Sequence, residues 1–154
     1  MKEKIVENIG RLSLHDSTLE KIEKTEDKLI LTVDWAKLEN YTEKNIGEGI
    51  ILGQCELIFY GFNNENLKLD FTGTPGNENI EPKEIEFDIL LFNEWLILDN
   101  KPNNGNKYCL NGLIDYEEKC GWLDWTFSFS KFKLSWNNSV TWEEWRNGKL
   151  VEKE

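Results

Sequence analysis

Residues 123–136 read Leu-Asp-Trp-Thr-Phe-Ser-Phe-Ser-Lys-Phe-Lys-Leu-Ser-Trp and decide the fold. Apolar side chains fill every second position from Leu123 to Phe129, which is the pattern of a strand with one buried face. After residues 130–131 the apolar positions resume at Phe132 with the opposite parity. Both sets stay inside only if the backbone bends or bulges between them. The stretch therefore predicts a sheet that curls over a core, as a sandwich or an open barrel.

Strand patterns dominate the rest of the chain as well. Residues 19–25 and 29–35 flank the turn signal Glu26-Asp27-Lys28 and predict a hairpin. A second hairpin is predicted from residues 50–60 and 67–71 around a turn at 63–66. Further strands are expected at 85–91, 95–98 and 108–118, and loops at 36–49 and 99–107, with a tight turn at Asn104-Gly105.

Two short helices complete the expected fold. Residues 2–10 carry apolar positions at helical spacing. At the other end, Thr141 can cap a helical turn, with Glu144 as its capping-box partner and Gly148 as the stop. A hairpin through Asn147-Gly148 is the alternative. The sequence thus predicts a mainly β chain (β-rich α+β), a single domain over 1–154 with one antiparallel sheet and one or two short helices.

Charge and composition narrow the function. The formal net charge is −11, which argues against nucleic acid and anionic membranes as partners. It favours a basic protein partner, or it simply keeps the chain soluble. The sequence shows no signal peptide and no transmembrane span, so a cytoplasmic protein is expected. Its single alanine and its many Lys, Asn and Ile residues indicate an AT-rich, bacterial genome.

Familiar catalytic and metal-binding patterns are absent from the sequence. With one histidine, His15, neither HExxH nor a three-histidine metal site is possible. Cys55, Cys109 and Cys120 lack zinc spacing and are expected to be reduced and buried. No phosphate-binding loop and no nucleophile elbow occur. We therefore expect no catalytic residue, no metal and no cofactor, which makes an enzyme the less favoured class.

Two other classes remain open. A small hydrolase would use paired carboxylates, for which Glu84, Glu86 and Asp88 are candidates, although such a row usually forms the wet face of a sheet. A carbohydrate-binding module would use exposed tryptophans, because indole rings stack on sugar faces. Four tryptophans on strand patterns are expected in the core instead: Trp35, Trp122, Trp125 and Trp136.

Two short motifs are the candidate partner-binding residues. One is His15 with Asp16, where the acid can orient the imidazole, or where the pair simply forms a turn before the first long strand. The other lies in the predicted C-terminal helix, where aromatic and acidic side chains either dock the tail or form a binding hot spot. This second motif comprises Trp142, Glu143, Glu144 and Trp145.

The segment Leu14-His15-Asp16-Ser17-Thr18-Leu19-Glu20-Lys21-Ile22, followed by Asp27-Lys28-Leu29-Ile30-Leu31, carries a resemblance. It resembles the His-Asp-Ser start of several small uncharacterised bacterial families, some of them described as immunity proteins of polymorphic toxin systems. The resemblance covers about the first quarter of the chain. It implies a cytoplasmic, β-rich, non-enzymatic protein that neutralises a protein partner, possibly a basic toxin. It supplies no catalytic residues.

Overall fold

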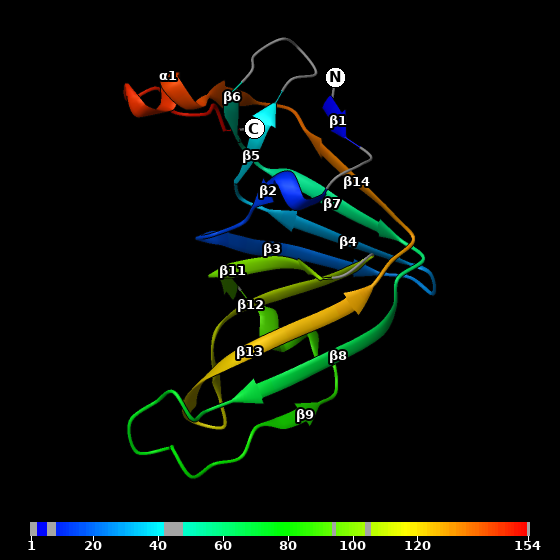
Figure 1. The fold of residues 1–154 in the computed structure, drawn as a ribbon, viewed down its shortest axis with the longest axis vertical. Coiled ribbons are helices and arrows are strands. Elements are labelled where there is room, and N and C mark those ends of the chain that lie inside the picture. Colours follow the sequence, from blue (N-terminus) through cyan, green and yellow to red (C-terminus); the bar gives the residue numbers. More distant parts are fainter. Residues whose placement is uncertain (1–2, 6–8, 42–47, 94, 104–105, 154) are drawn as a thin grey trace.

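The computed structural model describes residues 3–5, 9–41, 48–93, 95–103 and 106–153, which form three antiparallel sheets (Figure 1). The six-stranded sheet has the order β1 (Glu3–Ile5), β14 (Lys131–Trp136), β7 (Cys55–Tyr60), β4 (Lys28–Val33), β3 (Ser17–Lys24) and β10 (Trp95–Ile97). The five-stranded sheet has the order β11 (Asp99–Asn103), β12 (Lys107–Tyr116), β13 (Lys119–Ser128), β8 (Asn63–Asp70) and β9 (Lys83–Ile85). The four-stranded sheet has the order β15 (Ser139–Thr141), β6 (Glu48–Leu52), β5 (Ala36–Tyr41) and β2 (Leu12–Ser13). The predicted mainly β fold is confirmed, with three sheets in place of one.

The six- and five-stranded sheets enclose the core, and the chain passes directly from one sheet to the other. Their edge strands β10 and β11 are separated by Leu98 alone, whose N–H donates to the carbonyl oxygen of Asn111 at 2.9 Å. The predicted bend near residue 130 is also confirmed. β13 ends at Ser128 in the five-stranded sheet and β14 begins at Lys131 in the six-stranded sheet. Between the described strands the two sheets do not close into a barrel.

Aromatic side chains fill the space between these two sheets. Phe59 of the six-stranded sheet lies 4.9 Å, centroid to centroid, from Phe127 of the five-stranded sheet. It also lies 5.6 Å from Tyr108. Trp125 and Trp136 are buried, as predicted, whereas Trp35 and Trp122 are only partly buried. Buried aromatic area thus compensates for a modest apolar content.

A crease separates the six-stranded sheet from the four-stranded sheet. Each strand of the smaller sheet continues a strand of the larger one, so that β15, β6, β5 and β2 follow the same order as β14, β7, β4 and β3. The breaks between the paired strands lie side by side, and we call this line the crease. It consists of residues 14–16, 34–35, 53–54 and 137–138.

The buried positions step by three at the crease instead of by two. Leu52 and Cys55 are both buried, as are Val33 and Ala36 on the neighbouring strand. The third pair is Leu14 and Ser17. In these three strands one extra residue turns the next side chain back to the same face, and the strand bends there. The spacing of the apolar residues therefore indicates the crease, as it indicates the bend near residue 130.

The first predicted hairpin is confirmed, and the second is wrong. β3 and β4 pair antiparallel around residues 25–27. β7 and β8 are consecutive in the chain but belong to different sheets. β8 already begins at Asn63, the first residue of the predicted turn, so the chain crosses between the sheets at residues 61–62. Local turn signals show where a strand ends but not which strand it pairs with.

Several predicted boundaries also need correction. The predicted loops at 36–49 and 99–107 contain the strands β5 and β11, and residues 42–47 and 104–105 lie outside the described part. The crease divides the predicted strand at 50–60 into β6 and β7. Of the predicted strand at 85–91, only Ile85 lies in a strand, and a 3₁₀ helix follows at Ile89–Phe92. Within 2–10 the structure shows strand β1, and a 3₁₀ helix at Ile9–Arg11, where a helix was expected.

The C-terminal helix α1 (Trp142–Arg146) forms as predicted. Thr141 Oγ1 accepts from the N–H of Glu144 at 3.1 Å, and the Glu144 carboxylate accepts from the N–H of Thr141 at 3.0 Å. Gly148 follows with a φ of +93°, which suits glycine after a helix end. No helix among the described residues has the length and apolarity needed to cross a bilayer.

Candidate functional site

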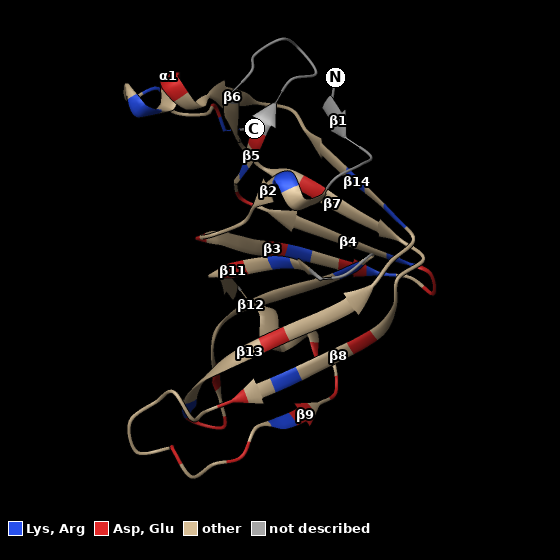
Figure 2. Cartoon of the chain, in the orientation of Figure 1, with Lys and Arg blue, Asp and Glu red and all other residues tan. Residues whose placement is uncertain are grey.

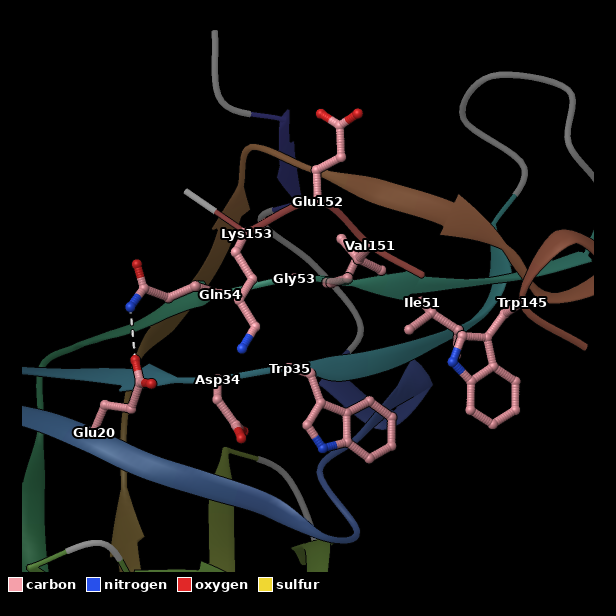
Figure 3. A pocket seen from close by; sticks show the side chains of 11 residues that line it. Glu20, Asp34, Trp35, Ile51, Gly53, Gln54, Trp145, Val151, Glu152 and Lys153 are labelled. Carbon is pink, nitrogen blue, oxygen red and sulfur yellow. Dashed lines mark hydrogen bonds between the residues drawn. The ribbon is translucent and has the colours of Figure 1, made fainter. Parts of the chain in front are cut away.

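A pocket of about 570 Å³ lies along the crease (Figure 3). Its walls come from β3, the breaks at residues 34–35 and 53–54, β6, α1 and the C-terminal segment. The side chains that give it chemical character are Glu20, Asp34, Trp35, Trp145, Glu152 and Lys153. The pocket is of the size that holds small ligands or a few residues of a peptide.

Two tryptophans supply the aromatic part of the pocket. Trp35 stands in the crease, and its Nε1–H donates to the carbonyl oxygen of Asp16 at 3.0 Å. Trp145 extends from α1 and is 41% exposed. Its ring stacks on Trp142 with centroids 5.2 Å apart and planes at 21°. Each indole is thus held by a second residue, which gives the pocket ordered aromatic faces.

Carboxylates supply the acidic part. Glu20 Oε2 accepts from the Gln54 amide at 2.6 Å, and Asp34 Oδ1 accepts from the N–H of Thr18 at 2.7 Å. Within the described residues neither carboxylate has an ion-pair partner. Burial raises the pKa of the underlying Cys55 thiol, and the negative charges of Asp34, Glu20 and Glu56 raise it further.

Acidic side chains outnumber basic ones around the pocket. Figure 2 shows acidic and basic residues alternating along β3, β8 and β9 rather than gathering on one strand. The pocket, by contrast, is lined among the described residues by three carboxylates and by Lys153 as its one cationic side chain. The pocket therefore offers a cationic ligand more negative than positive charge.

The C-terminal segment forms one wall of the pocket. The Asn138 amide donates to the carbonyl oxygen of Glu152 at 3.0 Å, and the N–H of Gly53 donates to the carbonyl oxygen of Asn138 at 2.9 Å. A Cβ on Gly53 would lie 2.9 Å from a methyl carbon of Val151. Glycine at this point of the crease therefore allows the tail to pack closely against the sheet.

His15 and Asp16 lie beside the pocket rather than in it. His15 Nδ1 lies 2.5 Å from the carbonyl oxygen of Leu98, which can only accept, so this nitrogen carries a proton. Asp16 has a φ of +65°, and its N–H donates to the carbonyl oxygen of Ile97 at 2.8 Å. The turn joins the start of β3 to the β10–β11 junction and positions Trp35. This geometry favours the structural interpretation of the pair.

Replacing His15 with alanine is expected to lower the free energy of unfolding by about 0.5–1.5 kcal/mol, because one hydrogen bond to Leu98 is lost. Urea denaturation measures this loss, and His15→Gln, which keeps a donor, should show a smaller one. Partner binding should be largely retained in both variants. Loss of binding at unchanged stability would instead make His15 a contact residue.

The second predicted motif lies partly in the pocket. Trp145 lines the pocket, and the ring of Trp142 stacks on it. Trp142 also contacts Lys37, whose Nζ lies 3.9 Å from the centre of the Trp142 ring. Glu144 is engaged in the capping box and in an ion pair with Lys149 at 2.6 Å. These contacts lower the pKa of Glu144, the bond from Lys149 most strongly. Glu143 is exposed. The helix both docks the tail and presents one aromatic ring.

The three cysteines differ in burial, and burial limits the reactivity of Cys55. Cys55 is buried, and its raised pKa keeps the thiol protonated, whereas the thiolate is the nucleophile. Cys109 is partly buried, and Cys120 is exposed, contrary to the prediction of three buried cysteines. All three are free thiols. In the part of the chain that the structure describes, no group of three or more His, Cys, Asp or Glu side chains is arranged to hold a metal ion.

Sequence reasoning missed most of the pocket. Trp35 was assigned to the core because it continues the alternation of Leu29, Leu31 and Val33. The residue that indicates the outward turn of Trp35 is Ala36. Ala36 is buried like Val33, three residues earlier, so the alternation is interrupted between them. Glu20, Asp34 and Glu152 come from separate segments, and nothing local in the sequence connects them.

Comparisons with known proteins add no relative. No protein-family model, no curated protein and no solved structure matches this chain.

Proposed function

We propose that this chain is a non-enzymatic binding protein of the immunity-protein kind, and that it holds a protein partner at the crease pocket. The observation that carries the proposal is the pocket itself, in which two ordered indoles lie beside carboxylates that have no ion-pair partner among the described residues. Tryptophan is among the residues that dominate binding energy at protein interfaces. The turn that holds His15 and Asp16 supports this site through the bond from Trp35 to Asp16, and Trp142 supports it by stacking on Trp145.

The net charge of −11 points to a basic partner. Complementary charge speeds the encounter of two proteins and disfavours partners of the wrong sign. A basic toxin in the bacterial cytoplasm meets this description, and neutralising it requires no chemistry from the chain. The pocket holds only a few residues, so it would anchor one segment of the partner while the surrounding strands contact the rest.

Trp145→Ala is expected to weaken partner binding by about 2 kcal/mol or more, the effect of removing an interface hot spot. The experiment co-expresses the chain with the products of its neighbouring genes and measures survival. One neighbour should be toxic alone and harmless with the unaltered chain. The Trp145→Ala variant should fail to protect.

Trp122→Ala is the matched control. Trp122 is a partly buried tryptophan that lies on the five-stranded sheet, where its Nε1–H donates to Asp124 at 2.9 Å. It should protect like the unaltered chain. If no neighbour is toxic, or if the chain protects against none, the proposed function is wrong. If both tryptophan variants protect equally, the partner binds elsewhere.

Sugar binding is the alternative that the same pocket favours, because indole rings stack on sugar faces and carboxylates accept hydroxyl hydrogen bonds. Titration with oligosaccharides, followed by tryptophan fluorescence, separates the two functions. Saturable quenching that Trp145→Ala abolishes would favour the sugar-binding module. A hydrolase has weaker support, since His15 contacts Leu98 and Asp16 and no nucleophile.

A further inference from the structure

We propose that the crease pocket accepts an arginine or lysine side chain of the partner, and that Lys153 of the chain's own tail stands in for it when the partner is absent. This inference rests on the proposed function, because it specifies which group of the partner enters the pocket. It also predicts a competition between the tail and the partner that a plain docking surface would not show.

The aromatic faces of the pocket suit a cation. Tryptophan attracts ammonium and guanidinium groups through its ring quadrupole more strongly than the other aromatic side chains do. The chain already uses this contact, with Lys37 Nζ 3.9 Å from the centre of the Trp142 ring and Lys24 Nζ 3.7 Å from that of Phe87. Within the described residues no cation lies over Trp35 or Trp145.

The carboxylates complete the site for a cation. Glu20 and Asp34 each accept one hydrogen bond from a neutral donor and keep their remaining acceptor sites for another group. An ionised carboxylate forms its strongest hydrogen bonds with Arg or Lys, and an arginine can bind in a bidentate manner. Aromatic faces beside unpaired carboxylates thus match the flat, apolar body and the charged edge of a guanidinium group.

Lys153 shows how such a side chain would enter. Figure 3 shows its side chain directed into the pocket, on the side of Asp34 and Trp35. Yet Lys153 forms no ion pair with any described residue. The tail therefore places an ammonium group at the site without binding it tightly.

An incoming cation has to displace only the side chain of Lys153, while the backbone of the tail stays in place as a wall of the pocket. The tail is held by the bond from Asn138 to Glu152 and by the ion pair of Lys149 with Glu144. Removing the charge of Lys153 should consequently help an incoming cation. The gain expected from an exposed, unpaired lysine is about two- to fivefold in affinity.

The test is an NMR titration that follows the indole N–H signals of Trp35 and Trp145. The probes are the tripeptides Gly-Arg-Gly and Gly-Lys-Gly with blocked termini, and Gly-norleucine-Gly is the neutral probe of similar length. The cationic probes should give saturable shifts, and the neutral probe should give none. Equal shifts from all three, or none from the cationic probes, would overturn the proposal.

Charge substitutions assign the binding to the pocket. Asp34→Asn keeps the oxygen that accepts from Thr18 and should weaken the cationic probes at least fivefold. Asp115→Asn, on an exposed position of β12, is the matched control and should bind like the unaltered chain. Lys153→Gln should bind the probes two- to fivefold more tightly. Equal affinities for the two aspartate variants would contradict the cation site, and unchanged affinity for Lys153→Gln would contradict the role of the tail.

The outcomes separate this inference from the proposed function. If a toxic neighbour is neutralised equally well by Asp34→Asn, the cation site is wrong and the binding function stands. If the cationic probes bind as described but the chain protects against no neighbour, the cation site stands and the immunity function is wrong.

Discussion

Replacing Gly112 with alanine is expected to lower the free energy of unfolding by about 2–4 kcal/mol, because overpacking costs about 1–3 kcal/mol and a weakened hydrogen bond about 1 kcal/mol more. A Cβ at this position of β12 would overlap the carbonyl oxygen of Leu96 in β10. It would also lie 3.1 Å from Trp95 Nε1, which donates to the carbonyl oxygen of Leu113 at 3.1 Å. The two backbones would have to separate where the six- and five-stranded sheets join.

Gly73→Ala is the control for this prediction. A Cβ at Gly73 meets no atom within 4 Å, and its φ lies outside the left-handed region. The stability of this variant should stay within about 0.5 kcal/mol of the unaltered chain. Urea denaturation compares the two. Equal midpoints would mean that β10 can move away from β12 without cost, contrary to the close approach that the structure shows.

Replacing Glu65 with alanine is expected to cost about 3 kcal/mol, near the lower end for breaking a buried ion pair because the pair is partly exposed. The Glu65 carboxylate in β8 pairs with Lys24 Nζ in β3 at 2.8 Å and accepts from Trp125 Nε1 at 2.8 Å. The side chains of Lys24 and Glu65 are only 26% and 19% exposed. Without Glu65, a half-buried ammonium group between Phe62 and Phe87 would lose its counter-charge.

The adjacent surface pair provides the control. Lys21 and Glu23 lie on the same strand as Lys24 and form an ion pair of 3.0 Å, but their side chains are 62% and 48% exposed. Glu23→Ala should therefore cost no more than about 1 kcal/mol. Thermal and urea unfolding of the three proteins test this difference. A Glu65→Ala variant as stable as Glu23→Ala would show that the pair does not hold the two sheets together.

Glu65→Gln divides the contribution of Glu65 into two parts. Glutamine keeps an acceptor for Trp125 but removes the negative charge that Lys24 needs. Its loss of stability should be smaller than that of Glu65→Ala, since the indole N–H remains satisfied. Together these variants and those of Gly112 test two of the places where the six- and five-stranded sheets are held to each other.

The spacing of apolar residues marks the bends as well as the strands, although only the bend near residue 130 was predicted from it. The step from Phe129 to Phe132 predicted a bend there, which the structure shows to be a passage between two sheets. The same three-residue step from Val33 to Ala36, and from Leu52 to Cys55, marks the crease. It was overlooked there because Ala36 is small and because Trp35 continues the regular alternation. A large aromatic residue at a strand end is therefore weak support for a core position.

The capping box of α1 was predictable because its residues lie within one helical turn. The pairing of β7 with β14, and of β10 with β3, was not. These pairings join residues far apart in the chain, and the alternation that identifies a strand is the same whichever neighbour it has. The hairpin expected between β7 and β8 failed for this reason.

By itself, the sequence determined that the chain is mainly β, where most strands lie, which side of each is apolar, and that the C-terminal helix carries Trp142 and Trp145. These properties depend on residues close together in the chain. The tertiary structure decided that Trp35, Glu20, Asp34 and the C-terminal tail meet at the crease. Their meeting depends on strand pairing between distant parts of the chain, as when Val140 of β15 pairs with Ile51 of β6 beside the crease.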